Sequence, residues 1–260
     1  MKVFLGGARG SFSVSGADQV RYGGDTFALL AEDRDGSQVL IDAGSGVRHL
    51  AGRLRPGSTA FFTHTHLDHL VGIPVLTAMW PRQLVSPQGG LQEALARVFS
   101  PPVWPVKLPA VEFPVPVAPV EIGGLRVSWQ AVAHPDGCLA YRVDESATGA
   151  AVVVATDLEW PAMTPRAQDA FAVFAKGVDL LVFDAQYLPE EYAAHKGWGH
   201  STWTDAVEVA RRCSAQKLWL IHHDPDRTDA ELDAMSAAAA AACKGAVFPT
   251  VENMTEVLHE

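Results

Sequence analysis

Residues 63–70 read "THTHLDHL", the most informative short stretch of the chain. It holds three histidines and one aspartate within six positions: His64, His66, Asp68 and His69. The residues just before the turn, Thr59 to Thr63, are typical of a β-strand that runs straight into a polar loop. Imidazole and carboxylate groups bind zinc, and also manganese or iron. Because the chain has only ten histidines, three so close together predict a metal site rather than a loop that is rich in histidine by chance.

The order of these residues also resembles a family signature. His-x-His-x-Asp-His directly after a strand is similar to the metal-binding motif of the metallo-β-lactamase superfamily. The resemblance implies an α+β fold, the four-layer αββα metallo-β-lactamase sandwich, with its metals at one sheet edge. It also implies that further ligands follow in order at the ends of later strands.

Three later apolar runs do end in ligand-type residues. His134 follows "SWQAVA", Asp157 follows "VVVAT", and His222 and His223 follow "LWLI". Each of these residues alone would be interpreted as a loop residue or a turn former. In the order that the resemblance requires, they complete a set of ligands.

The resemblance implies two divalent metal ions per chain, with zinc favoured over manganese or iron. One ion is assigned to His64, His66 and His134, the other to Asp68, His69 and His222, and Asp157 bridges the two. His222 is favoured over His223 because the family's last ligand directly follows its strand. A hydroxide held between two metals can serve as the nucleophile, and Asp68 can orient it as well as bind metal. Asp68 is therefore a catalytic candidate.

Length, composition and charge narrow the class of protein. The chain has 260 residues, of which 48% are hydrophobic, and it shows no composition shift, so we expect a single domain over residues 1–260. A net charge of −10 argues against a long nucleic acid as the main partner. The three cysteines lie far apart, which argues against a disulfide framework. No signal peptide or membrane span is recognisable, so we expect a cytoplasmic protein without a membrane partner.

Hydrophobic periodicity outlines alternating strands and helices. Strands are expected at residues 3–5, 26–31, 37–44, 59–63, 125–133, 138–144, 150–157, 179–185, 217–225 and 245–251. Helices are expected after Leu70, at residues 91–99, at residues 203–213, and from Thr228 to just before Gly245. This pattern favours layered sheets with helices on their outer faces.

Residues 101–119 contain seven prolines and cannot hold a helix. We expect an extended loop or an edge segment here. It is either a surface connector or a functional element, a lid or a subunit contact. A homodimer that uses this contact is one possibility.

Residues 195–206, "HKGWGHSTWTDA", distinguish between acyl and phosphoryl chemistry. Ser201 or Thr202 is a good N-cap, so His200 lies just before a helix N-terminus, where backbone N–H groups favour an anion. A histidine beside a bound phosphate can donate a proton to a leaving alkoxide. Trp198 is a candidate for stacking on a nucleobase, whereas Trp203 lies on the apolar stripe of the helix and is expected in the core.

This region also resembles the ribonuclease Z-like branch and its bacterial phosphodiesterase relatives. The similar segments are "GHSTWTDAVEVA", "LIHHDP", "RYGGDT" (Arg21 to Thr26), "IDAGSG" (Ile41 to Gly46) and "ATDLE". The resemblance implies that His200 and Ser201 bind phosphate and that His200 protonates the leaving group. Only about two dozen residues separate Asp157 from the strand at Leu180. They contain no basic, glycine-rich arm for transfer RNA, which favours a small phosphodiester as substrate.

We therefore expect a dinuclear metal-dependent hydrolase, and most of all a phosphodiesterase that cleaves a small nucleotide-like diester, with His200 as general acid. A hydrolase of carboxylic esters, lactones or thioesters on the same site is the first alternative. A non-catalytic binding protein of this fold is the second.

Overall fold

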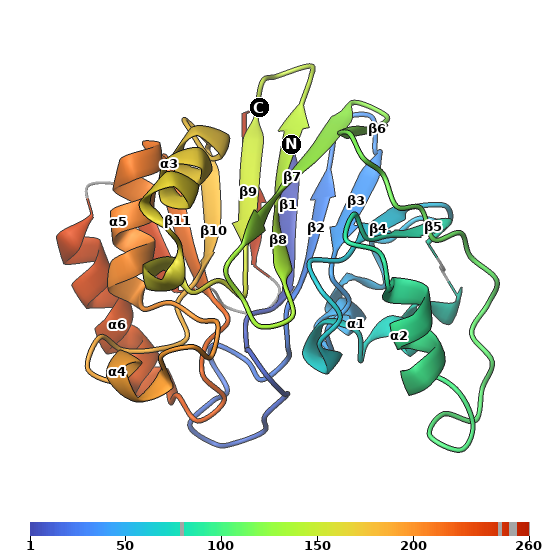
Figure 1. Cartoon of the computed structure of the whole chain (residues 1–260), viewed down its shortest axis with the longest axis horizontal. Coiled ribbons are helices and arrows are strands. Elements are labelled where there is room, and N and C mark those ends of the chain that lie inside the picture. Colours follow the sequence, from blue (N-terminus) through green and yellow to red (C-terminus); the bar gives the residue numbers. More distant parts are fainter. Residues whose placement is uncertain (79–80, 244–245, 250–253, 260) are drawn as a thin grey trace.

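The computed structural model describes residues 1–78, 81–243, 246–249 and 254–259. Two β-sheets lie face to face at its centre, and helices cover both outer faces (Figure 1). This is the αββα arrangement expected from the histidine motif, and the predicted α+β class is confirmed.

Within the described residues, the first sheet has six strands in the order β13-β1-β2-β3-β4-β5. Its members are β1 (Lys2–Gly7), β2 (Ala28–Glu32), β3 (Gln38–Ile41), β4 (Thr59–Phe61), β5 (Gln83–Val85) and β13 (Thr255–Val257). The pairs from β13 to β3 are antiparallel, whereas β3, β4 and β5 run parallel. The carboxyl ends of β3 and β4 therefore lie at the same edge.

The second sheet, in the part of the chain that the structure describes, has seven strands in the order β12-β11-β10-β9-β8-β7-β6. Its members are β6 (Val120–Ile122), β7 (Leu125–Val132), β8 (Cys138–Glu145), β9 (Ala151–Ala155), β10 (Leu180–Asp184), β11 (Lys217–Ile221) and β12 (Ala246–Pro249). Strands β9 to β12 are parallel, and β8 is antiparallel to both β7 and β9. The carboxyl ends of β7, β9, β10 and β11 consequently share one edge.

Helices are divided between the two faces. The helices are α1 (Val47–Leu50), α2 (Leu91–Val98), α3 (Pro165–Phe174), α4 (Tyr192–His195), α5 (Trp203–Cys213) and α6 (Asp229–Ala242). Helices α1 and α2 lie on the side of the first sheet, and α3 to α6 lie on the side of the second (Figure 1). Both α5 and α6 begin with a capping box, in which Thr202 and Thr228 each accept from the N–H three residues on.

Three separate apolar clusters hold these four layers together. One lies between the sheets and includes Leu5, Tyr141 and Trp219. A second lies between the second sheet and its helices, with Trp160 and Phe171 among its members. The third lies under α1 and α2. Because a helix or sheet must bury its apolar face against another element, three clusters are what four layers require.

Most expected elements are present, with informative differences. The helix expected after Leu70 is a 3₁₀ helix, η2 (Ile73–Ala78), and a shorter 3₁₀ helix, η1 (Leu67–His69), lies within the histidine motif before it. Pro74 lies in η2 and has no N–H to donate in a longer α-helix. The sequence patterns missed the strands β5, β6 and β13 and the helices α1, α3 and α4, which are short or weakly periodic. The strand expected at 245–251 is present at 246–249, and the rest of that range lies outside the described residues.

The proline-rich residues 101–119 form an extended segment without a helix, as predicted. Glu112 forms an isolated parallel bridge with Gln83, and the Leu84 N–H donates to the carbonyl oxygen of Glu112 at 3.0 Å. The segment thereby covers the open edge of β5, which limits pairing with other chains. Its role as a lid or a homodimer contact stays a prediction. Of the helices in the described part of the chain, none has the length and hydrophobicity needed to cross a bilayer.

Candidate metal centre and active site

The ligand-type residues lie at the edge where six strands end. Asp42 follows β3, the histidine motif follows β4, His134 follows β7, and Asp157 and His222 follow β9 and β11. Asp184, the last residue of β10, lies there too. The two sheets face each other, so the loops of both sheets meet over this edge.

Three of these residues have left-handed backbone conformations. The φ angles of Asp42, Asp157 and His222 are 57°, 54° and 60°. Such angles are uncommon outside glycine and cost free energy, so they persist only where the surroundings enforce them. Each turns the chain sharply at the end of a strand.

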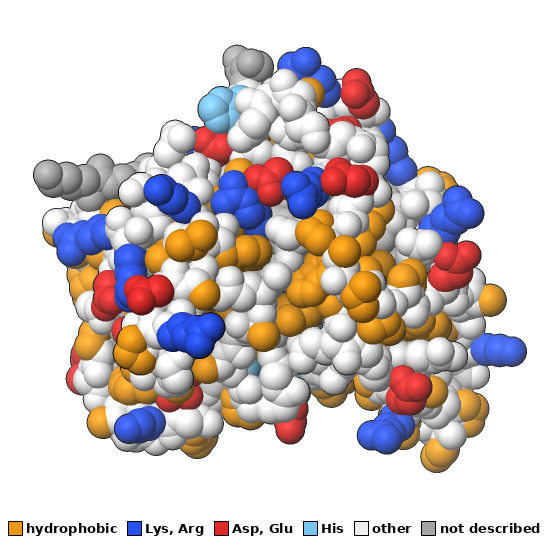
Figure 2. Space-filling model, turned by 45° about the horizontal axis from the view of Figure 1, so that its top comes forward, with side chains coloured by type: hydrophobic (Ala, Val, Ile, Leu, Met, Phe, Trp, Pro, Cys, Tyr) orange, Lys and Arg blue, Asp and Glu red, His pale blue; other side chains and the backbone are white. Residues whose placement is uncertain are grey.

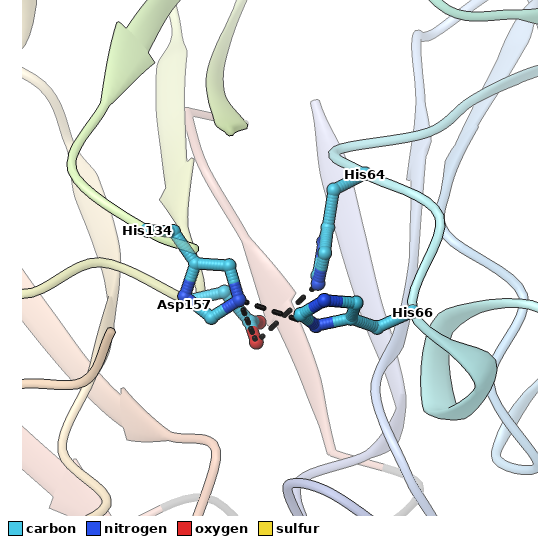
Figure 3. Close-up of side chains that lie close together, drawn as sticks. All are labelled: His64, His66, His134 and Asp157. Carbon is cyan, nitrogen blue, oxygen red and sulfur yellow. Dashed lines mark hydrogen bonds and ion pairs between the residues drawn. The ribbon is translucent and has the colours of Figure 1, made fainter. Parts of the chain in front are cut away.

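The first cluster consists of His64, His66, His134 and Asp157, whose ligand atoms all lie within 4.8 Å of one another. His64 and His66 come from the loop of the first sheet, and His134 and Asp157 come from the second (Figure 3). His134 Nε2 lies 3.2 Å from His66 Nδ1 and 3.8 Å from Asp157 Oδ1.

The second cluster consists of Asp68, His69, Asp157 and His222, all buried and again within 4.8 Å of one another. His69 Nε2 lies 3.1 Å from Asp157 Oδ2, and His222 Nε2 lies 3.2 Å from Asp157 Oδ1. Asp157 belongs to both clusters, so its carboxylate stands between them. The two clusters contain the same residues as the two predicted ligand sets.

The nitrogen atoms that face these clusters fit a metal. His64 Nε2, His69 Nε2 and His222 Nε2 are buried and have no hydrogen-bond partner. The other ring nitrogen of His69 contacts Asp42 Oδ2 at 2.8 Å, and that of His222 contacts Gln186 Oε1 at 2.8 Å. Buried polar atoms are normally paired, and a metal-binding histidine usually donates its other N–H to an oxygen. Both features fit Nε2 atoms that bind a divalent cation.

The electrostatics of the clusters fit a cation as well. Burial lowers the pKa of His64 well below its usual value. Burial also lowers the pKa of His222, but the nearby Asp157 and Asp68 outweigh it and raise that pKa to about 9. Burial raises the pKa of Asp157, but His222, His69 and His64 outweigh it and hold it well below the usual range. The carboxylates attract positive charge, which a divalent cation supplies while the imidazoles are neutral.

Sequence reasoning missed the residues that orient these ligands. Asp42 is fully buried and accepts from the Thr63 N–H and hydroxyl as well as from His69. Burial raises its pKa, and these three donors oppose the rise. On the other side of the clusters, Asp184 contacts His200 Nδ1 and Gln186 contacts His222 Nδ1. A signal was available, because "LIDAG" and "VFDA" end apolar strands in an aspartate just as "VVVATD" does.

His200 lies beside both clusters and is buried. Its Nδ1 contacts Asp184 Oδ2 at 2.9 Å, so Nε2 is the nitrogen left for other partners. Its ring stacks on His222 at 4.8 Å between centroids and meets His134 edge-on at 5.2 Å. His200, Asp184 and His222 also form a third group of ligand-type atoms. The Nδ1 contacts of its two histidines with Asp184 and Gln186 account for that group without a metal.

Thr202, not Ser201, caps α5, so His200 stands two residues before the cap. The Ser201 hydroxyl is fully buried, donates to the Leu158 carbonyl at 2.5 Å and accepts from the Trp160 N–H at 3.0 Å. The Ser201 N–H donates to Asp184. Ser201 therefore fixes the loop before α5, and its hydroxyl is engaged with main-chain groups there.

His223 is separated from both clusters. Both of its ring nitrogens are buried without a hydrogen-bond partner, and its ring meets Tyr22 edge-on at 6.4 Å. Burial and the nearby Arg9 lower its pKa to about 3. The strand end thus directs His222, and not its neighbour, toward the ligand clusters.

Trp198 is 60% exposed and meets His195 edge-on at 5.0 Å. His195 in turn stacks on Tyr187 at 4.3 Å, and Tyr187 lies 6.0 Å from His200. A row of rings therefore leads from the surface to His200. Trp203 is partly buried against the core, as expected.

The segments "RYGGDT" and "IDAGSG" meet behind the histidine motif. Thr26 and Ser45 each bond the other's main-chain N–H through a side-chain oxygen at 2.9 Å. The Thr26 hydroxyl donates to the Asp68 carbonyl at 2.7 Å, and the Ser11 N–H donates to the Asp68 carboxylate at 3.0 Å. These contacts fix the turn that carries Asp68.

A match to a known family accompanies this geometry. The family described as "Beta-lactamase superfamily domain" matches residues 37–223, most of the chain, and the chain belongs to it. Family and site together define a metal-dependent hydrolase of this superfamily.

Individual relatives are more distant. A ribonuclease Z from Agathobacter rectalis is 23% identical over 247 residues, covering 76% of this chain and 82% of that protein. The metallo-beta-lactamase fold protein YhfI from Bacillus subtilis superposes with a TM-score of 0.73 at 18% identity, covering 98% of each chain. A diphosphatase from the PhnP family gives a TM-score of 0.71 at 18% identity, covering 100% of this chain and 98% of that one. At this identity the two structures establish the fold alone.

Proposed function

We propose that the protein is a dinuclear metal-dependent phosphodiesterase that acts on a small nucleotide-like diester. The observation that carries the proposal is the His200–Asp184 pair beside the two ligand clusters. A cluster of ligands alone fits ester, lactone or phosphoryl chemistry equally. A buried histidine held by a carboxylate adds a proton donor, which favours a substrate whose leaving group is a poor one.

The ligand sets would hold two divalent ions, His64, His66 and His134 binding one, Asp68, His69 and His222 the other, and Asp157 both. Zinc fits these nitrogen and oxygen donors, and manganese or iron fits them too. Such ions, when bound, lower the pKa of water and polarise phosphoryl oxygens. A chemistry of this kind supplies a nucleophile at neutral pH.

The protein's own residues would orient the attacking water and protonate the leaving group. Asp68 accepts the Ser11 N–H at Oδ2 and would use its carboxylate to orient the attacking water. His200, with Nδ1 held by Asp184, would bind a phosphoryl oxygen and give the proton on Nε2 to the leaving alkoxide. Trp198, at the surface end of the aromatic row, would stack on a base.

RNA is the second candidate substrate, and the ribonuclease Z relative favours it. Two features favour the small diester over RNA as the substrate. The residues between β9 and β10 form η3 (Trp160–Ala162) and α3, which packs on the sheet through the fully buried Phe171. The second feature is the net charge of −10, since a long phosphate backbone needs clustered positive charge. Figure 2 turns the edge with the two termini toward the viewer, and on that face basic side chains are interspersed with acidic ones.

The test compares two phosphodiesters in the zinc-loaded protein. Bis(p-nitrophenyl) phosphate releases a phenolate that needs no proton, whereas a 3′,5′-cyclic nucleotide releases an alkoxide that does. His200→Ala should lower kcat on the cyclic nucleotide by about 10²- to 10⁴-fold and lower it much less on the nitrophenyl diester. His259→Ala is the matched control, because His259 pairs with Asp179 at the opposite edge.

Four results would contradict the proposal. Equal losses on the two diesters would remove His200 as the acid. Hydrolysis of lactones or thioesters without diester cleavage would favour the carboxylic ester hydrolase. Binding of metal with no turnover of any ester would favour a non-catalytic protein, and faster cleavage of a structured RNA than of any small diester would favour the ribonuclease.

A further inference from the structure

Glu159 is a buried carboxylate that belongs to neither ligand cluster. It follows Asp157 by two residues and is 3% exposed. Its carboxylate accepts four contacts from three neutral donors. The Tyr192 hydroxyl donates to Oε1 at 2.8 Å, the Gly197 N–H contacts both oxygens at 2.8 and 3.0 Å, and the Gly199 N–H donates to Oε2 at 3.0 Å.

The loop that Glu159 binds has an unusual backbone. Gly197 and Gly199 have φ angles of 87° and 93°, which side chains rarely permit. A Cβ at Gly199 would lie 2.2 Å from His134 Nδ1, so the backbone passes directly against that ring. The two glycine amides are turned toward the same carboxylate.

This loop holds one metal-ligand candidate and carries the proton donor. The Gly199 carbonyl accepts from His134 Nδ1 at 2.9 Å, which leaves Nε2 for the first cluster. The next residue is His200. Any movement of Gly199 therefore shifts the orientation of His134 and the position of His200 together.

Glu159 also joins the loop to two strand ends. Its own N–H donates to the Ala133 carbonyl at 2.8 Å, next to His134. Its neighbours Leu158 and Trp160 bond the Ser201 hydroxyl on the far side of His200. The segments after β7, β9 and α4 are thus connected around one carboxylate.

We propose that Glu159 is a positioning residue: its carboxylate holds residues 197–199 so that Gly199 orients His134 and His200 meets the leaving group. The part that concerns His200 rests on the proposed phosphodiesterase function, and the part that concerns His134 does not. A carboxylate suits this role because it accepts from two converging N–H groups and donates to neither. Glutamine has nearly the same size but would place its own N–H₂ against one of them.

The experiment compares Glu159→Gln with Asp33→Asn. Asp33 is the matched control because it is also buried and accepts from the main-chain N–H groups of Asp35, Ser37 and Gly124, but lies between β2 and β3 at the opposite edge. The first readout is hydrogen exchange of the Gly197 and Gly199 amides in metal-free protein. The second is zinc affinity by chelator competition. The third is the ratio of kcat on the nitrophenyl diester to kcat on the cyclic nucleotide.

Glu159→Gln should speed exchange of at least one of the two glycine amides, weaken zinc by about 10- to 100-fold and raise the rate ratio by about tenfold or more. Asp33→Asn should leave all three at wild-type values. Unchanged amide exchange and zinc affinity in Glu159→Gln would overturn the proposal. If the wild type cleaves no diester, the proposed function fails, and exchange and zinc affinity still decide the role of Glu159. If Glu159→Gln does not fold, Tyr192→Phe removes one donor and should shift the same readouts in the same direction, and unchanged values there would overturn the proposal.

Discussion

Asp42→Asn tests whether a buried carboxylate behind the site sets the metal affinity. Asp42 Oδ2 contacts both the Thr63 hydroxyl, at 2.7 Å, and His69 Nδ1, at 2.8 Å. Asparagine keeps the shape but places its N–H₂ group either at the Oδ2 position, against both of these partners, or at the Oδ1 position, against the Thr63 N–H. In the first orientation, the imidazole of His69 moves its proton to Nε2, the nitrogen that faces Asp68 and Asp157.

The magnitude follows from these contacts. Loss of an outer partner of a metal-binding histidine weakens metal binding by about 10- to 100-fold. At about 1.4 kcal/mol per factor of ten, that is about 1.4 to 2.8 kcal/mol of binding free energy. The metal-free protein should lose about 1 to 3 kcal/mol of stability, because one buried donor is left without an acceptor.

The assay is zinc competition with a chromogenic chelator at neutral pH, together with urea unfolding of the metal-free protein. Asp33→Asn serves as control, since it should lower stability without weakening zinc. A zinc affinity of Asp42→Asn within threefold of the wild type would refute the reasoning, because the tautomer of His69 would then not depend on Asp42.

Three further predictions follow from other parts of the site and the helix layer. Thr202→Ala and Thr228→Ala should each lower the free energy of unfolding in urea by about 1 kcal/mol, because each removes a helix cap. Only Thr202→Ala should also lower turnover, and equal effects of the two variants on turnover would contradict this. Gly199→Ala should weaken zinc and reduce activity at least as much as Glu159→Gln, because its Cβ would lie 2.2 Å from His134 Nδ1, and a fully active variant would contradict the close approach. Burial raises the pKa of Cys213 to about 11, so its stabilising effect is present below the ordinary value of 9.0 and is lost as pH rises from about 9 through about 11. Iodoacetamide at pH 8.5 should accordingly modify the half-buried Cys243 well before Cys213, as mass spectrometry of the peptides would show, and the reverse order would contradict it.

The sequence predicts the residues of the two clusters because the relevant order is local. His64, His66, Asp68 and His69 lie in one turn, and the remaining candidates each follow an apolar run directly. A strand end places the next side chain at the sheet edge whatever its neighbours are, so the pattern carries the position. Hydrophobic periodicity is likewise a local property, so it predicted most of the strands and helices that form the four layers.

The sequence patterns missed or misassigned short elements because the form of such elements depends on their hydrogen-bond partners. Strand β13 is three residues long and exists through its pairing with β1, where Lys2 lies opposite Val257. The helix expected after Leu70 is 3₁₀ because Pro74 falls within it. Neither outcome follows from hydrophobic periodicity, which reports burial and not hydrogen-bond partners.

The order of residues along the chain identifies the candidate metal ligands and their places after successive strands. The orientation of their side chains depends on how the two sheets pack. His69 is paired with Asp42, His222 with Gln186 and His134 with Gly199, across 27, 36 and 65 residues of chain. Those partners become neighbours only when the strand order is set and the two sheets face each other. The same packing directs His222 into the site and leaves its neighbour His223 against Tyr22. It also brings Glu159 to the loop before His200.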